Sequence, residues 1–177
     1  MEDIKLILSQ YLDNSLNKKY IITIGIRDQK LTLYENYKEI QNYKISSSKY
    51  GEGSEGGSNK TPLGAHYIKE FIGGNADIFT IFESRKPITN KAKVIKTWES
   101  TKEDIITTRI LWLSGLENGK NKGTNLDSYS RYIYIHGTNE EGMLGKKASH
   151  GCIRMGNSDI IDLCNREIAN ALVYISN

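Results

Sequence analysis

The stretch Ser149-His150-Gly151-Cys152-Ile153-Arg154-Met155, together with Tyr134-Ile135-His136-Gly137 upstream, gathers a cysteine, two histidines and an arginine in a short part of the chain. The whole sequence holds only three histidines and two cysteines. A nucleophilic cysteine needs a base, a group that orients this base, and backbone N–H donors for the developing oxyanion. Because the two stretches can supply all of these groups, they predict a cysteine acyl-transfer site.

The surroundings of the two cysteines predict different roles for them. Cys152 follows a loop rich in glycine and lysine, and the nearby histidines are expected to lower the pKa of its thiol and to take its proton. Cys164 lies on the apolar face of a predicted helix, which is typical of a structural cysteine. His150 shares a face with Cys152 on an extended backbone, whereas His136 ends a predicted strand on another segment. The residues alone leave the choice of base between these two histidines open.

Length and composition describe one β-rich globular domain. The 177 residues are enough for one sizeable core, and 38% of them are hydrophobic and 25% charged. Eleven tyrosines against two prolines favour strands. The net charge of +3 is small and dispersed, which does not favour nucleic-acid binding. No apolar run approaches the roughly 18 residues of a membrane span.

The hydrophobic periodicity predicts a chain made mostly of strands, with two short helices. A short amphipathic helix is expected over residues 3–16, and a second helix after Met155, capped by Asn157 or Ser158. The segment 84–93 is expected to be a polar turn. Strands are expected over residues 20–26, 31–34, 40–47, 63–68, 78–83, 107–113, 132–136 and 172–175.

The pair Ile135-His136-Gly137 and Ser149–Met155 resembles the signature of the YkuD-type L,D-transpeptidases, cysteine enzymes that cross-link bacterial peptidoglycan. Lys60-Thr61-Pro62-Leu63-Gly64 resembles the Thr-Pro-x-Gly turn of this family. The segment Gln29–Tyr34 is similar to the opening hairpin of this family, and the segments Ile110–Glu117 and Arg131–Tyr134 are similar to segments of its proteobacterial branch. The resemblance extends from about residue 20 to 176.

The resemblance implies a fold and a set of site residues. The fold is a mostly antiparallel β-sandwich with a C-terminal helix, so we expect an N-terminal helical extension at 1–18 and a catalytic domain at 19–177. Cys152 would be the nucleophile and His136 its base, with the ring held by the carbonyl of Gly137. His150 would shape the nucleophile loop. The backbone N–H groups of Gly151 and Cys152, with that of His150, would form the oxyanion hole. Arg154 would stabilise the site or bind an anionic part of the substrate, and the remaining substrate-binding positions are Ser149 and Tyr134.

The resemblance also implies a reaction, acyl transfer on peptidoglycan stem peptides through a Cys152 thioester, with no metal or organic cofactor. An L,D-carboxypeptidase using the same site and a non-catalytic peptidoglycan-binding module are the alternatives. A zinc site made by His136, His150 and Cys152, with Cys164 as a further ligand, is disfavoured, because His-x-Cys is not a usual zinc-ligand spacing and Cys164 lies on the core face of a predicted helix. We expect a monomer in the cell envelope or periplasm. The N-terminus carries Glu2 and Asp3 where a secretory signal is basic, so a cytoplasmic location stays open.

Overall fold

The computed structural model describes residues 6, 9–11, 15–101 and 103–177. In this part of the chain the fold is mainly β, with one ten-stranded sheet, a short 3₁₀ turn and one helix near the C-terminus. The elements are β1 (Asn17–Gly25), β2 (Lys30–Glu35), β3 (Lys38–Ser46), β4 (Gly64–Ile72), β5 (Thr80–Glu83), β6 (Lys86–Lys91), β7 (Ile106–Gly115), β8 (Tyr134–Thr138), η1 (Glu141–Met143), β9 (Ile153–Met155), α2 (Asn157–Cys164) and β10 (Ala171–Ser176).

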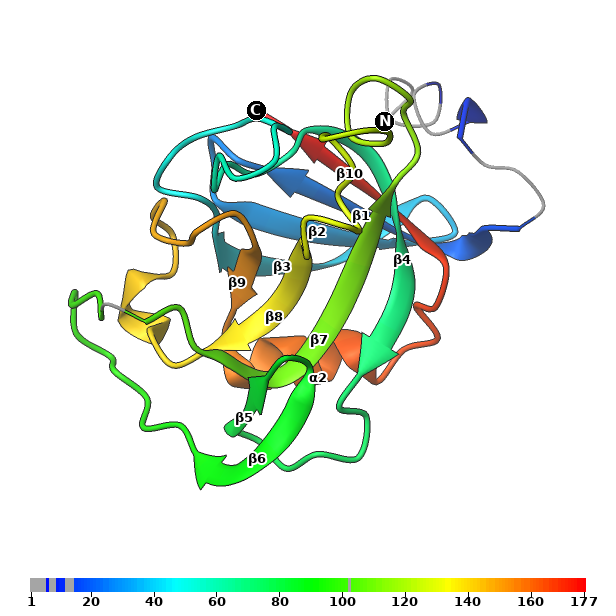
Figure 1. Cartoon of the computed structure of the whole chain (residues 1–177). Helices are drawn as coiled ribbons and strands as arrows, with labels where there is room; N and C mark the ends of the chain where they lie inside the picture. Colours follow the sequence, from blue (N-terminus) through cyan, green and yellow to red (C-terminus); the bar gives the residue numbers. More distant parts are fainter. Residues whose placement is uncertain (1–5, 7–8, 12–14, 102) are drawn as a thin grey trace.

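The sheet wraps around and closes on itself. Its strand order is β4-β10-β1-β2-β3-β9-β8-β7-β5-β6, and an additional pairing of β4 with β7 joins the first eight strands of this order into a ring. Figure 1 shows β1, β2 and β10 crossing the upper part of the molecule, whereas β7 and β8 run steeply through its middle. The hairpin of β5 and β6 extends from β7 outside the ring.

The expected predominance of antiparallel pairs is confirmed, but the sandwich needs a correction, because the structure has a single mixed sheet. Two pairs are parallel, β1 with β10 and β8 with β9. Parallel neighbours cannot be joined by a tight hairpin, and each needs a longer connection. For β8 and β9 that connection is the segment 139–152, which carries η1 and the nucleophile loop. The parallel pairing thus places this loop beside the functional residues of β8.

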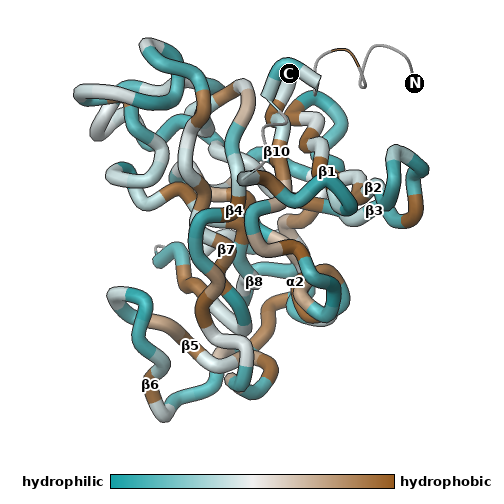
Figure 2. Tube along the Cα trace, turned by 90° about the vertical axis from the view of Figure 1, so that its right-hand side faces the viewer, coloured by the Kyte–Doolittle hydropathy of each residue, from teal (hydrophilic) through white to brown (hydrophobic). Residues whose placement is uncertain are grey.

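Alternation along the strands fills the interior of the ring. Ile22, Ile24, Leu31 and Leu33 are fully buried and belong to the main core, as period-2 patterning requires. Ile160 of α2 joins the same core. In Figure 2 hydrophobic residues are spread along the labelled strands, while the loops at the edge of the molecule are mostly hydrophilic.

The two helix predictions have different outcomes. The C-terminal helix is confirmed, although its N-cap is Gly156, which has no capping side chain, and not Asn157 or Ser158. Asn157 instead donates its backbone N–H to Glu141 Oε1 at 2.9 Å. Cys164 ends the helix and packs against the main core, in agreement with a structural role. The N-terminal helix over 3–16 lies mostly outside the described residues and stays a prediction, as does the extension at 1–18.

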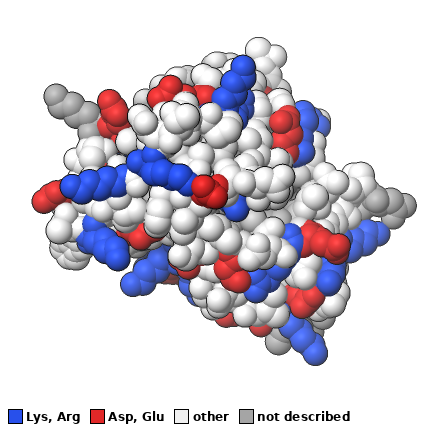
Figure 3. Space-filling view, turned by 90° about the horizontal axis from the view of Figure 1, so that it is seen from below, with Lys and Arg blue, Asp and Glu red and all other residues white. Residues whose placement is uncertain are grey.

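On the face in Figure 3, basic and acidic side chains are interspersed and neither sign dominates. Within the described ranges, no helix has the length and hydropathy that a membrane span requires.

Candidate active site

Strand register brings the predicted site residues onto one face of the sheet. In the parallel pair of β8 and β9, Ile135 lies opposite Ile153 and His136 opposite Arg154. Both isoleucines are in the enclosed core, so their neighbours point to the other face. His136 and Arg154 therefore lie on the outer face of the ring. Tyr134 and Cys152 come two residues before them in the sequence and lie on the same face. The spacing of two residues in each motif is what makes this possible.

The imidazole of His136 is arranged as a base. Its Nδ1 lies 2.8 Å from the carbonyl oxygen of Gly137, and because a carbonyl only accepts, Nδ1 carries the proton. Nε2 is then unprotonated, and in the described structure it is buried and has no hydrogen-bond partner. Burial holds the pKa of His136 below its ordinary value, and the nearby Asp104 carboxylate offsets this only in part. The ring is neutral at pH 7, with a lone pair free to accept a proton.

The thiol of Cys152 is held by two backbone contacts, one from the first residue of β8 and one from the segment before it. The Tyr134 N–H donates to Sγ at 3.4 Å, and Sγ donates to the carbonyl of Tyr132 at 3.4 Å. Cys152 keeps some exposure, yet burial of its thiol raises the pKa to about 12, and the Asp104 carboxylate acts in the same direction. The expectation of a lowered thiol pKa therefore fails for the free protein. The arrangement is a neutral thiol with a neutral imidazole.

The loop before Cys152 needs a glycine and is tied down at several points. Gly151 has φ +127°, a conformation that residues with a side chain rarely adopt. Thr61 donates its hydroxyl to the Gly151 carbonyl at 3.0 Å, so the Thr61-Pro62 turn fixes the loop from outside. Ser149 is buried and donates its hydroxyl to the Cys152 carbonyl at 2.6 Å. Ser149, expected to bind substrate, is thus placed to shape the loop.

Two of the three N–H groups expected in the oxyanion hole have partners in this structure. The His150 N–H donates to Asp104 Oδ2 at 3.0 Å. The Gly151 N–H donates to Ser149 Oγ at 3.3 Å, a long bond that is easily exchanged for one to a substrate oxygen. Gly151 therefore fits the expected role better than His150.

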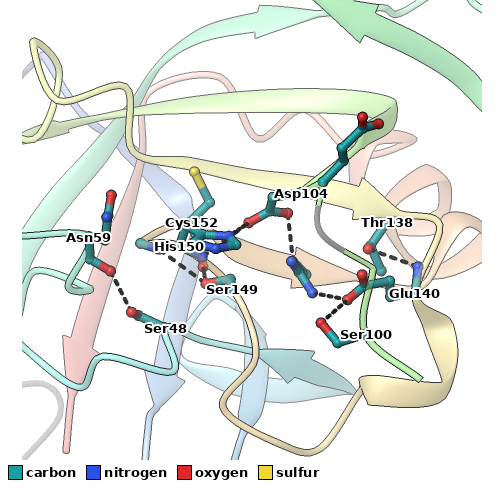
Figure 4. Close-up of polar contacts among 12 residues, drawn as sticks. Ser48, Asn59, Ser100, Asp104, Thr138, Glu140, Ser149, His150 and Cys152 are labelled. Carbon is teal, nitrogen blue, oxygen red and sulfur yellow. Dashed lines mark hydrogen bonds and ion pairs between the residues drawn. The ribbon is translucent and has the colours of Figure 1, made fainter. Parts of the chain in front are cut away.

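Asp104, which the sequence did not single out, connects the site. Its Oδ1 accepts from Arg154 Nε at 2.8 Å, and its Oδ2 accepts from His150 Nδ1 at 3.2 Å. Figure 4 shows the Asp104 carboxylate beside His150, close to Cys152. Burial by itself raises the pKa of Asp104, but electrostatic interactions with His136 and Arg154 and the hydrogen bonds from Arg154 and the His150 N–H outweigh it, and the net pKa lies below its usual range. Asp104 is therefore an anion placed next to the base, the nucleophile and the loop.

Arg154 is only 1% exposed and is shared between two carboxylates. Besides its bond to Asp104, its Nη1 donates to Glu140 Oε2 at 2.7 Å, and the Glu140 side chain is fully buried. Of the two roles expected for Arg154, this geometry favours stabilising the site over contacting a substrate.

Tyr134, the other expected substrate-binding residue, is also buried. Its ring packs edge-on against Trp112, with centroids 5.5 Å apart. Its backbone N–H donates to the thiol of Cys152, and Cys152 packs against the apolar cluster that includes Tyr134.

A cavity of about 420 Å³ adjoins the nucleophile loop. His150, Arg131 and Tyr132 are among its lining residues. A larger cavity of about 650 Å³ lies between the start of the β4–β5 connection and the β5–β6 hairpin, and none of the residues lining it belongs to the nucleophile loop. The smaller cavity is therefore the better candidate for substrate.

In the described ranges, no group of three or more His, Cys, Asp and Glu side chains is placed to hold a metal ion. Cys164, the further ligand considered for a zinc site, packs against the core instead.

The raised thiol pKa predicts a distinctive alkylation profile. Only the thiolate reacts with iodoacetamide, so alkylation of Cys152 at pH 7.5 should be at least about tenfold slower than that of a model thiol with a pKa near 8.5. The rate should still be rising at pH 10. The measurement uses a Cys164→Ala variant, in which Cys152 is the only thiol. A rate that levels off below pH 8 would instead indicate a preformed thiolate–imidazolium pair.

Comparison with known proteins gives one family and one fold. The profile of the YkuD family, the L,D-transpeptidase catalytic domain, matches residues 19–175. No curated protein is significantly similar to the chain in sequence. Among solved structures, L,D-transpeptidase 3 from Mycobacterium tuberculosis, in complex with a faropenem-derived adduct, is 13% identical with a TM-score of 0.56, over 90% of this chain and 60% of that one.

Two other solved structures have the same fold. Bd1075 from Bdellovibrio bacteriovorus is 16% identical with a TM-score of 0.52, over 90% of this chain and 48% of its own. A mutant of the Enterococcus faecium L,D-transpeptidase is 14% identical with a TM-score of 0.53, over 91% of this chain and 50% of its own. The chain thus spans about half to three-fifths of the length of these proteins.

Proposed function

Because the chain belongs to the family of YkuD-type L,D-transpeptidase catalytic domains, we propose that it is a cysteine acyltransferase that forms 3→3 cross-links between peptidoglycan stem peptides. One observation carries this proposal beyond family membership. The unprotonated Nε2 of His136 is buried without a partner, on the same face of the sheet as the Cys152 thiol. Such an atom normally has a hydrogen-bond partner, and a proton from the nucleophile supplies one.

The first half of the proposed reaction forms a thioester. Nε2 of His136 takes the S–H proton of Cys152 while the sulfur attacks the carbonyl of the third stem residue, a diamino acid. The C–N bond to the terminal D-Ala then breaks, and His136 returns the proton to the leaving amine. The developing oxyanion is held by backbone N–H groups of the nucleophile loop, with that of Gly151 as the first candidate.

The second half releases the enzyme. The side-chain amine of the diamino acid in another stem attacks the thioester and gives up a proton through His136, and the Cys152 thiol is restored. Water in place of the amine would make the protein an L,D-carboxypeptidase. The residues described above are the same for both acceptors.

We also propose that the protein acts in the cell envelope and that it belongs to the proteobacterial branch of the family. Each of these two proposals rests on a single argument. Cross-linked peptidoglycan lies outside the cytoplasmic membrane, so the proposed substrate implies an envelope location. The branch rests on the segments Ile110–Glu117 and Arg131–Tyr134 alone.

Mass spectrometry of tetrapeptide muropeptides incubated with the wild type and with Cys152→Ala tests the function. We expect 3→3 dimers from the wild type alone, together with an intermediate in which Cys152 carries the tripeptide. Loss of terminal D-Ala without dimers would favour the carboxypeptidase. Binding of the muropeptides by both proteins, with no product from either, would contradict the proposal in favour of a binding module.

A further inference from the structure

Arg131 is a partly buried cation without an acidic partner in the described structure. It lies in the segment that leads into β8, and its guanidinium donates to the carbonyl of Lys60 at 2.8 Å and more weakly to the Gly53 carbonyl at 3.3 Å and to Ser58 Oγ at 3.4 Å. All three acceptors are neutral. Among the ion pairs of the described residues, none joins Arg131 to an aspartate or a glutamate.

The contrast with Arg154 shows that this is unusual. Arg154 is buried in the same region, and two carboxylates compensate its charge. For Arg131, burial lowers the pKa from its ordinary value, and the only interaction that opposes this is with Cys152. A partly desolvated guanidinium gains most from a carboxylate, which it can bind through two parallel hydrogen bonds. Arg131 therefore has unused capacity for an anion.

The cavity of about 420 Å³ beside the nucleophile loop gives such an anion a place. Asn59, Asn125 and Ser130 line it together with Arg131 and offer amide and hydroxyl donors. No aspartate or glutamate is among its lining residues. His150, two residues before Cys152, forms part of the wall. A ligand in this cavity therefore lies next to the nucleophile loop.

We propose that this cavity is a carboxylate subsite, in which Arg131 binds a carboxylate of the peptide whose carbonyl is attacked by Cys152. The inference rests on the proposed function and adds a substrate feature to it. The terminal carboxylate of a tetrapeptide stem is one residue beyond the scissile carbonyl, which spans at most about 3.8 Å. A carboxylate on the side chain of the diamino residue has the same chemistry, so the test separates these two sources.

The test measures binding of synthetic tetrapeptides to Cys152→Ala protein by calorimetry. One peptide has a free terminal carboxylate, a second has a terminal amide, and a third has only its side-chain carboxylate amidated. We expect one of the two amidated peptides to bind at least about tenfold more weakly than the acid, as for loss of a hydrogen-bonded ion pair. Which amide loses affinity identifies the carboxylate. Adding Arg131→Gln should abolish that difference, and Arg131→Lys should keep part of it because the charge remains.

Arg85 provides the matched control. Its guanidinium also lies near the site, 5.0 Å from the ring centroid of Trp112 and 5.1 Å from that of Tyr132. Arg85→Gln should leave the preference for the acid unchanged. Equal affinity for all three peptides, or a preference that survives Arg131→Gln, would overturn the subsite even if the wild type makes cross-links. Binding of none of the peptides, with no turnover by the wild type, would overturn the subsite and the proposed function together.

Discussion

His136→Ala is expected to lower the rate of thioester formation on Cys152 by at least about 10³-fold. With the thiol pKa near 12, roughly one Cys152 in 3 × 10⁴ is ionised at pH 7.5 without a base. In the proposed reaction His136 overcomes this, because its unprotonated Nε2 can take the proton during attack. The measurement is the rate at which Cys152 gains the mass of the tripeptide, by quenched mass spectrometry with a tetrapeptide donor.

His150→Ala is the matched control for this experiment. Its ring is bonded to Asp104 through Nδ1, and its side chain is 32% exposed, so it lacks the buried setting of His136. We expect a loss of about tenfold, from a loosened nucleophile loop. A severe loss in His150→Ala beside a mild one in His136→Ala would transfer the role of base to His150. Circular dichroism of both variants shows whether either loss reflects unfolding.

The parts of the fold that follow from local pattern were predictable. β7 was expected over 107–113 and spans Ile106–Gly115, because its apolar residues alternate between two buried faces. β6 (Lys86–Lys91) was mistaken for a polar turn, since it is the exposed outer strand of a hairpin and has no apolar alternation to reveal it. The parallel pairing of β8 with β9 was also missed. The local sequence of each strand does not indicate which distant strand it pairs with or in which register.

Some residues of the candidate site could likewise be predicted from the sequence, and others could not. Cys152 and His136 stand in short motifs, so the sequence could single them out. Asp104 and Glu140 have no motif, and Asp104 reaches His150 only because the connection from β6 to β7 runs back along the segment after β8. Backbone hydrogen bonds hold it there, with the Ile95 N–H donating to Asn139 at 2.7 Å. A buried arginine beside the nucleophile implies a carboxylate partner, but nothing in the sequence identifies which one.

Arg154→Ala is expected to lower the free energy of unfolding by about 3–5 kcal/mol. The substitution leaves the carboxylates of Asp104 and Glu140 without their shared cation, and the Glu140 side chain has no exposure to water. A domain of this kind has a total stability of about 5–15 kcal/mol, so the loss is a large fraction of it. Urea unfolding followed by circular dichroism measures it, with an unchanged slope showing that the same transition is compared.

A second variant separates the cost of unpaired charge from the loss of packing. In the triple change Arg154→Met, Asp104→Asn and Glu140→Gln, no charge is left in the group, and the methionine fills most of the space of the arginine. Replacing a buried ion network with neutral groups of similar volume is often close to neutral in stability. The triple variant should therefore be more stable than Arg154→Met alone, which has the same packing but leaves both carboxylates charged, by at least about 2 kcal/mol. If Arg154→Met and the triple variant lose the same amount, the two carboxylates do not depend on Arg154 for their charge balance, and the further loss in Arg154→Ala comes from packing.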